Sequence, residues 1–461
     1  MPISPTSQGV EIGRRALQAQ QTALQVTSHN IANANTPGFS RQRVDLENAA
    51  GVLGGVGSGS DAVAIQRQRS SFLDAQVRVE QQVLGRWEAI ERSMTGLESI
   101  FNEPAGAGSS EAGTIFNEAS GLGLSGSLSR FWNAWQDLAN VPESGAARAA
   151  VRQEGDFLVT TMHQLSQRLS ESRSGLNDEV VNEAEEINAI LDQLAAINGE
   201  VPRARANGGS DADLADARDR LLEDLSSRVD ISVLYRENGQ VSVLLSGHNL
   251  VQATNAVHLT VRTLTQNEFP TASVFFADDG SPASITEGRL MGLMAARDQT
   301  IPDYQSRLDQ LAGAMVQEVN RLHRAGYGAG GTTGVSFFDN AKTSAGNISL
   351  DNEILADLDR IAASADGNAG DNGAALGISL LRNRRLLAGD TQTIESFYQT
   401  MLGDVGARSK EAQTMAENHR LFATQIENRR QGVMGVSLND EAAQLVLFSS
   451  GPTRRRRAPY P

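Results

Sequence analysis

The sequence predicts a mainly α-helical, elongated, multi-domain chain with one β-rich insertion, whose terminal helices pair as a coiled coil or bundle. Three observations lead to this prediction. Apolar residues recur at helical spacing near both ends and through the middle of the chain. The period changes from about 3.6 to 2 at Val229, and the helical period returns near Ser284. Because helices flank the strands in chain order, the two ends are expected to meet.

The first predicted element is a helix with two apolar stripes. One stripe repeats every seven residues, and the other, which also includes Ile12, lies nearly opposite. A helix with a single core neighbour needs one stripe, so two stripes predict a helix held between neighbours, as in a bundle or polymer. The predicted polymer-interface residues are Val10, Leu17, Leu24, Ile31, Ala16, Ala19, Ala23 and Val26.

A turn is expected where this helix stops. Its motif comprises Asn33, Asn35, Thr36, Pro37, Gly38 and Phe39. The two asparagines can satisfy terminal backbone groups, and Pro37 pushes the preceding residue out of the helical region. Pro37 and Gly38 suit the middle of a type II turn, in which Gly38 takes a positive φ. Alternation from Ser40 to Leu46 then predicts a strand.

Further helices follow from the same 3.6-residue period. They are expected at 71–101, 126–139 and from Ala146 to about Asn198–Gly199. Ser210 and Asp213 resemble a capping box that starts another helix. Its inward residues are expected to be Leu214, Ala217, Leu221 and Leu225.

Over residues 229–282 the pattern is typical of strands. Asn238–Gly239 predicts a hairpin with a type I′ turn, and runs at 257–264 and 273–277 predict more strands. A helix is then expected at 284–297, broken at Ile301–Pro302 and resumed to about Leu322. Residues 326–385 are rich in Gly and Asn, which predicts loops and brief strands. A last long helix is expected from Thr391.

These elements predict six regions. They are 1–60, an inner helix and turn; 61–228, a helical bundle; 229–282, an outward β-rich insertion; 283–385, returning helices and Gly/Asn-rich loops; 386–448, a C-terminal helical part; and 449–461, a Pro/Arg tail.

Composition limits the possible functions. The chain has 461 residues and a net charge of −15, which argues against nucleic-acid or anionic-membrane binding. No apolar run approaches the roughly 20 residues that span a bilayer, and the start lacks the pattern of a cleaved signal peptide. Cysteine is absent, which removes disulfides and thiol catalysis.

No catalytic, cofactor or metal site is predicted. Residues 326–331 fit GxGxxG, but a dinucleotide loop follows a strand and opens a helix, whereas this segment follows a helix. The six histidines show no metal-ligand spacing. Arg454–Arg457 is the one basic run, and it gives weak support for nucleic-acid binding on so acidic a chain.

The segment Asn30–Phe39 resembles the N-terminal signature of the axial proteins of the bacterial flagellum, which are rod, hook and hook-associated proteins. RFWNAWQDLANVP and MGVSLNDEAAQLVLF are similar to hook-associated members of that family. The resemblance implies a structural, non-enzymatic subunit that connects hook to filament and is needed for filament assembly. Its terminal helices would pair as the inner layer of a tube.

The same resemblance implies partners and a location. The expected assembly is a homo-oligomeric ring or helix that contacts the hook protein, a second junction protein and a flagellar export chaperone. The expected location is the extracellular flagellum, reached through the flagellar type III apparatus. A chain without cysteine suits such export, because it cannot cross-link while unfolded.

Two sets of alternatives stay open. Within the family, the chain could be the hook protein or the second junction protein. From another class, it could be a secreted coiled-coil effector or contain a hydrolase within 229–385. Ser437, with Asp440 and Glu441, starts a predicted helix that Pro452 cannot continue, so a shifted reading frame or true divergence is expected after Phe448.

Overall fold

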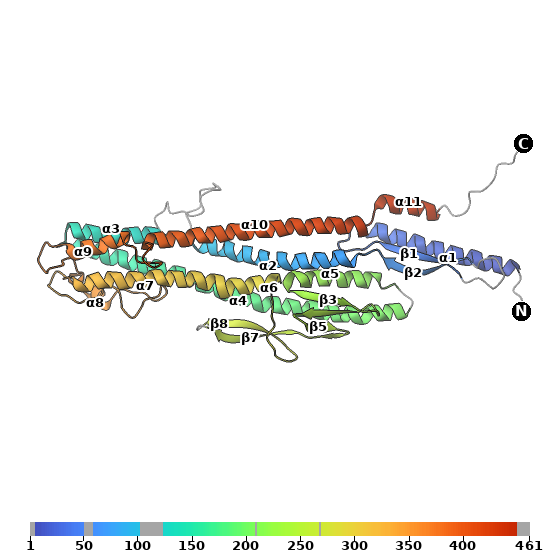
Figure 1. Ribbon diagram of the computed structural model, residues 1–461, viewed down its shortest axis with the longest axis horizontal. Coiled ribbons are helices and arrows are strands. Elements are labelled where there is room, and N and C mark those ends of the chain that lie inside the picture. Colours follow the sequence, from blue (N-terminus) through green and yellow to red (C-terminus); the bar gives the residue numbers. More distant parts are fainter. Residues whose placement is uncertain (1–4, 50–58, 102–122, 208–209, 267–268, 450–461) are drawn as a thin grey trace, which may run out of the picture. The chain divides into compact units, whose positions relative to one another are not determined.

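The structure is a computed structural model that describes residues 5–49, 59–101, 123–207, 210–266 and 269–449 (Figure 1). Most of the Gly-rich stretch 51–60, the segment 102–122 and the tail beyond Ser449 lie outside these residues. The chain divides into two compact units. Unit 1 comprises Met1–Arg86, Val181–Met291 and Glu417–Pro461, and unit 2 comprises Trp87–Val180 and Gly292–Ala416. The six predicted regions stay a prediction.

Unit 1 contains both ends of the chain. Helix α1 (Pro5–Ala32) is followed by strands β1 (Gln42–Asn48) and β2 (Ser60–Arg67), which pair antiparallel with a bulge after Asp45. The alternation beyond the turn predicted β1, whereas β2 was not predicted. Helix α11 (Leu438–Ser449) packs on α1 and follows α10 (Ile394–Met434) in the chain (Figure 1).

The β-rich part belongs to unit 1. One sheet has the order β3-β4-β5-β6, and β7 pairs separately with β8. The strands are β3 (Ile231–Tyr235), β4 (Val241–Leu245), β5 (His248–Gln252), β6 (Asn255–Ala256), β7 (Leu259–Gln266) and β8 (Phe269–Phe276). All pairings are antiparallel, as expected for strands joined by short turns. The predicted mainly α fold with a β insertion is confirmed.

The predicted type I′ turn is wrong. Of the two predicted central residues, Asn238 and Gly239, only Gly239 has a positive φ, at 86°. Its N–H donates to Arg236 O at 3.0 Å. A type I′ turn needs a positive φ at both central residues. The loop is therefore a tight turn followed by a left-handed glycine, a common longer hairpin connection.

Two helix predictions needed correction. Helix α4 (Gly145–Ala206) continues past Asn198–Gly199, because the Asn198 side chain is buried and bonds both the N–H and the C=O of Val241 instead of capping the helix. Helix α5 (Ala212–Arg228) lacks the predicted capping box. Ser210 Oγ accepts from Ala212 N–H at 3.2 Å rather than from residue 213.

The buried face of α5 also differs from the prediction. Leu225 is buried as expected, but Leu214, Ala217 and Leu221 are only partly buried. The face that turns inward is rotated and includes charged side chains. Its buried members are Ala212, Ala215, Asp216, Arg218, Asp219, Leu222, Leu225 and Ser226.

Unit 2 is built on helices α3 (Leu124–Asn140) and α7 (Ile301–Ala325) and on parts of α2 (Ser71–Phe101), α4 and α10. Pro302 does not break the predicted helix. It sits in the first turn of α7, where a missing N–H is tolerated, and a π-helical turn (Ala296–Thr300) joins α7 to α6 (Gly288–Ala295).

Residues 326–385 form short helices rather than brief strands. These are α8 (Asn352–Ala356), α9 (Gly373–Ser379) and two 3-10 turns (Leu358–Arg360 and Leu380–Asn383). Their connections pack apolar groups against α3, so this segment completes the core of unit 2. An aromatic cluster lies at the centre of this core and consists of Phe131, Trp132, Trp135, Phe337 and Phe338.

Candidate functional site

The two predicted stripes of α1 have different environments in unit 1. Ala19, Ala23 and Val26 are buried, where α1 packs on β1, β2 and α11. The side chains of Val10 and Leu17 on the other stripe are 72% and 63% exposed. One stripe therefore belongs to the fold of unit 1, and the other is available to a further partner. Of the remaining candidates, Ala16 is exposed, and Leu24 and Ile31 are partly exposed.

The turn after α1 has the predicted geometry. Phe39 N–H donates to Thr36 O at 3.2 Å, and Gly38 between them has a φ of +74°. A positive φ after Pro37 is what a type II turn requires. A Cβ on Gly38 would lie 2.6 Å from Arg220 Cγ, so this position also lacks space for a side chain.

Asparagine and phenylalanine side chains hold the turn on the end of α1. The Asn33 side-chain amide donates to His29 O at 3.1 Å, and Thr36 Oγ1 donates to Asn33 Oδ1 at 3.2 Å. The Phe39 ring meets the His29 ring edge-on, with centroids 5.4 Å apart. Asn35 is exposed, as are Thr36 and Pro37. The motif therefore combines a fixed backbone with an exposed tip.

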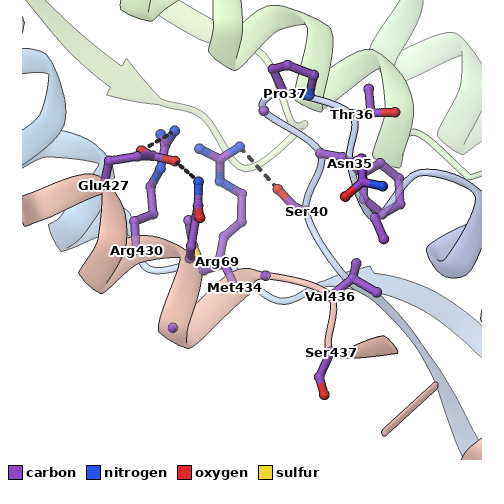
Figure 2. Close-up of a pocket in the computed structure, with 16 residues that line it drawn as sticks. Asn35, Thr36, Pro37, Ser40, Arg69, Glu427, Arg430, Met434, Val436 and Ser437 are labelled. Atoms are coloured by element: carbon purple, nitrogen blue, oxygen red, sulfur yellow. Dashed lines mark hydrogen bonds and ion pairs between the residues drawn. The ribbon is translucent and has the colours of Figure 1, made fainter. Parts of the chain in front are cut away.

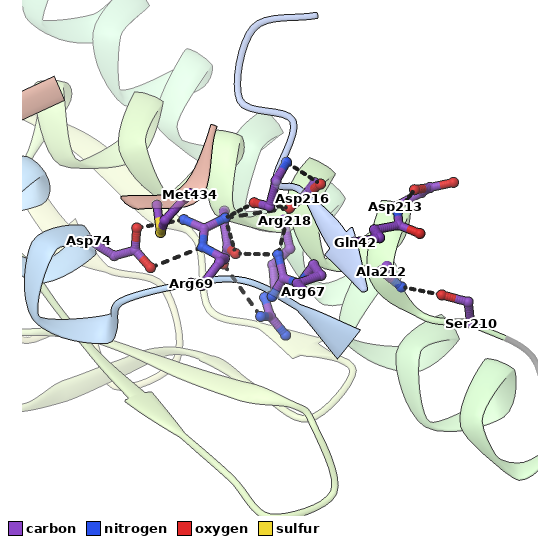
Figure 3. A network of polar contacts seen from close by, with 12 residues as sticks. Gln42, Arg67, Arg69, Asp74, Ser210, Ala212, Asp213, Asp216, Arg218 and Met434 are labelled. Carbon is purple, nitrogen blue, oxygen red and sulfur yellow. Dashed lines mark hydrogen bonds and ion pairs between the residues drawn. The ribbon is translucent and has the colours of Figure 1, made fainter. Parts of the chain in front are cut away.

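A buried polar network lies behind this turn (Figure 3). Ser40 donates from its N–H and its Oγ to the Asp216 carboxylate, at 3.0 and 2.8 Å. Arg67 donates to Asp216 at 2.7 Å and to Asp219 at 2.9 Å. Arg69 pairs with Asp219 at 2.7 Å and through both nitrogens with Asp74. The network thus joins the turn, β2, α2 and α5.

Burial and charge oppose each other in this network. Burial by itself would raise the pKa of Asp219, but the guanidinium groups of Arg69, Arg218 and Arg67 outweigh it and hold that pKa below its ordinary value. Burial likewise disfavours charged Arg69, yet Asp219 and Asp74 raise its pKa above the ordinary arginine value. Asp219 and Arg69 therefore both stay ionised near neutral pH.

A single buried carboxylate fixes α11. Glu441 is 0% exposed and accepts from Arg41 Nε at 2.7 Å and from the Asn30 side-chain amide at 3.1 Å. Asn30 also exchanges two hydrogen bonds with the backbone of Gln42, at 2.9 and 3.0 Å. The start of α11 is capped as predicted, since Ser437 Oγ accepts from Asp440 N–H at 3.3 Å. Helices α1 and α11 are thereby both tied to the start of β1.

A cavity of about 630 Å³ lies between the turn and the α10–α11 connection (Figure 2). Pro37 and Phe39 line it on one side, and Met434 and Val436 on the other. Arg69 lies at its edge near Ser40, as the dashed contact in Figure 2 shows. The cavity mixes apolar and cationic groups and adjoins the exposed tip of the turn.

The sequence did not reveal the polar network. Asp216 and Asp219 are three residues apart on one face of α5, and such charged pairs usually face solvent. The GxGxxG segment has no phosphate-binding geometry in unit 2, because Tyr327, Gly328 and Ala329 donate their N–H groups to protein carbonyls. Within the described residues, no helix is long and apolar enough to cross a membrane.

Comparison with known proteins agrees with these features. The family described as "Flagellar hook-associated protein FlgK helical domain" matches residues 109–338, and "Flagella basal body rod protein" matches residues 11–39, which hold α1 and its turn. Flagellar hook-associated protein 1 of Bacillus subtilis (strain 168) is 28% identical over 97% of this chain and 94% of its own length.

The chain belongs to the flagellar hook-associated protein family. Flagellar hook-associated protein 1 of Escherichia coli (strain K12) is also similar, with 23% identity over 94% of this chain and 93% of its own. The flagellar hook junction protein FlgK from Burkholderia pseudomallei shares the fold, with a TM-score of 0.66, 14% identity and coverage of 78% of this chain and 100% of that one. The predicted family and flagellar function are confirmed.

Proposed function

We propose that this chain is a structural, non-enzymatic subunit that joins the flagellar hook to the filament and is needed for filament assembly. The observation that carries the proposal is the exposed stripe of α1, where Val10 and Leu17 face away from the rest of unit 1. Val446 and Leu447 of α11 are similarly exposed, at 63% and 69%. Exposed apolar side chains on both terminal helices suit packing against other subunits.

The fold explains how such packing can be specific. Ala19 and Ala23 let α1 approach its own neighbours closely, and the buried polar network fixes the turn beside it. The exposed stripe is therefore presented on a helix of fixed orientation. Many weak contacts repeated around a ring or helix of identical subunits would then sum to a stable assembly.

Partners and location follow from the same proposal. The subunit would contact the hook protein on one side and a second junction protein on the other, and a flagellar export chaperone would bind it before export through the type III apparatus. The names of the similar proteins favour the first junction protein over the hook protein or the second junction protein.

Substitution of Leu17 tests the interface. Leu17→Asp should leave unit 1 folded, because the side chain is exposed, but should abolish filament assembly and motility. Gln21→Asp is the matched control, since it places the same charge at an exposed polar position of α1 and should leave motility intact. Normal motility of the Leu17→Asp strain would contradict the proposed interface.

Deletion of the gene tests the junction role. Electron microscopy should show hooks without filaments, with flagellin released into the medium. Cells with normal filaments would rule the role out. The alternative of a hydrolase within 229–385 predicts a hydrolytic activity of the purified chain that is lost when one acidic or histidine residue is replaced.

A further inference from the structure

We propose that His248, Asp278 and Asp279 form a binding site for a divalent transition-metal cation, with Zn²⁺ as its representative. One possible ligand atom from each residue lies within 4.8 Å of the other two. The site is in the β-rich part of unit 1, away from the terminal helices, and the inference is independent of the proposed junction role. Sequence spacing could not predict it, because His248 is about thirty residues from the aspartates.

The backbone brings the three residues together. His248 is the first residue of β5, and the two aspartates follow the end of β8. The chain turns tightly there: Gly280 N–H donates to Phe276 O at 3.0 Å, and Phe276 N–H donates to Ser281 O at 2.9 Å. Gly280 has a φ of +69°, which suits glycine.

Backbone hydrogen bonds orient the two carboxylates. Asp279 N–H donates to Asp278 Oδ1 at 2.9 Å, and Ser281 N–H donates to Asp279 Oδ1 at 2.8 Å. Asp278 Oδ2 lies 3.0 Å from His248 Nε2, and Asp279 Oδ2 lies 4.0 Å from His248 Nδ1. Both oxygens of Asp278 thus face Nε2, since Oδ1 also lies 3.1 Å from it, while Asp279 directs Oδ2 towards Nδ1. Such supporting bonds pre-orient the ligands of metal sites.

The imidazole is also fixed. Its ring stacks on Phe276, with centroids 4.0 Å apart and planes 11° from parallel. The His248 side chain is only 24% exposed. Two carboxylates beside an imidazole have room for a cation.

The donor set selects the type of metal. One imidazole nitrogen with two carboxylate oxygens suits Zn²⁺, Ni²⁺ or Cu²⁺, whereas Ca²⁺ and Mg²⁺ prefer oxygen donors alone. Three protein ligands leave a coordination position for water or for a donor from another molecule.

Isothermal titration of the untagged full chain with ZnCl₂, after removal of metal by a chelator, tests the proposal. The chain should bind zinc, and His248→Ala should weaken that binding by about tenfold or more, since even supporting residues of metal sites are worth about 10- to 100-fold. His258→Ala is the matched control. His258 Nε2 contacts a single carboxylate, Asp192 Oδ1, at 2.8 Å, so its loss should leave zinc affinity almost unchanged.

A further variant protects the test against a folding defect. Asp279→Asn keeps the size of the side chain and should weaken zinc binding with an unchanged circular dichroism spectrum. The proposal is overturned if the native chain binds no zinc, or if His248→Ala and His258→Ala weaken binding equally, which would show adventitious binding by surface histidines.

Discussion

His323 links the stability of unit 2 to pH through one buried ring. Its Nδ1 lies 2.8 Å from Val335 O, and its Nε2 accepts from Ala362 N–H at 3.0 Å. Nδ1 therefore carries the proton of a neutral imidazole, and Nε2 has no room for another. Burial lowers the pKa of His323 to about 4. The folded unit thus binds this proton less readily than the unfolded chain does.

Unit 2 should lose stability as the pH falls from about 6.5 to about 4, because the unfolded histidine gains its proton first. The full contribution is about 3 kcal/mol. Urea unfolding followed by tryptophan fluorescence measures it, since Trp87, Trp132 and Trp135 all belong to unit 2. His323→Gln should flatten the pH dependence relative to the exposed control His258→Gln. Equal slopes in the two variants would contradict this role.

Asp216 is a second residue whose burial has a measurable consequence. Its side chain is 3% exposed and accepts from Ser40 and Arg67. Asp216→Ala should destabilise unit 1 by about 3 kcal/mol, because breaking a buried ion pair leaves a charge without its partner. Hydrogen exchange of β1 should accelerate, while tryptophan fluorescence, which reports unit 2, stays unchanged. Glu237→Ala, at an exposed residue of the turn between β3 and β4, is the control and should have little effect.

At the scale of elements, a glycine sets how closely α2 approaches the end of α5. A Cβ on Gly85 would lie 1.9 Å from Ser227 O and 3.2 Å from Arg289 N. Both neighbours are backbone atoms, which cannot rotate away as a side chain can. A Cβ on Gly96 of the same helix would meet no such neighbour within 4 Å. The same residue type therefore has opposite consequences at these two positions.

Gly85→Ala should destabilise unit 1 by about 1–3 kcal/mol or more, because the elements must separate to admit a methyl group. Gly96→Ala should instead stabilise the chain by about 0.5–1 kcal/mol, since alanine favours a helix interior. Thermal melting by circular dichroism compares the two variants. An unchanged or higher melting temperature for Gly85→Ala would show that the close approach at Gly85 does not limit packing.

At the scale of the whole molecule, the fold and the proposed assembly interface use different faces of α1. The stripe with Ala19 and Ala23 is buried in unit 1, and the stripe with Val10 and Leu17 is exposed. Substitutions on the two faces should therefore fail in different ways. This separation allows a loss of assembly to be distinguished from a loss of folding.

Ala19→Asp should disrupt the packing of α1 on α11 and β2 and should also prevent assembly. Leu17→Asp should prevent assembly alone. Hydrogen exchange of α11 in the purified monomers measures the first effect, and motility measures the second. If Leu17→Asp also accelerated exchange in α11, the exposed stripe would be part of the fold and the proposed interface would be wrong.

The sequence determined the features that depend on near neighbours in the chain. The heptad spacing of apolar residues predicted helix α1, and Pro37–Gly38 predicted the turn after it. The structure contains both. The change of period at Val229 likewise located the β-rich part. The resemblance of Asn30–Phe39 to the axial proteins of the flagellum also pointed to the family, and a family model matches residues 11–39.

Only the tertiary structure decided which charged groups are buried and which distant residues meet. Asp216 and Asp219 look like solvent-facing residues of a helix until Arg67 and Arg69 are placed against them. In the sequence Pro302 and Asn198 look like helix breaks. In the structure Pro302 lies in the first turn of α7, and the Asn198 side chain bonds the backbone of Val241. His248 at the start of β5 lies close to Asp278 and Asp279 after β8, although the two strands belong to different sheets. Such contacts depend on burial across the fold, which periodicity along the chain does not encode.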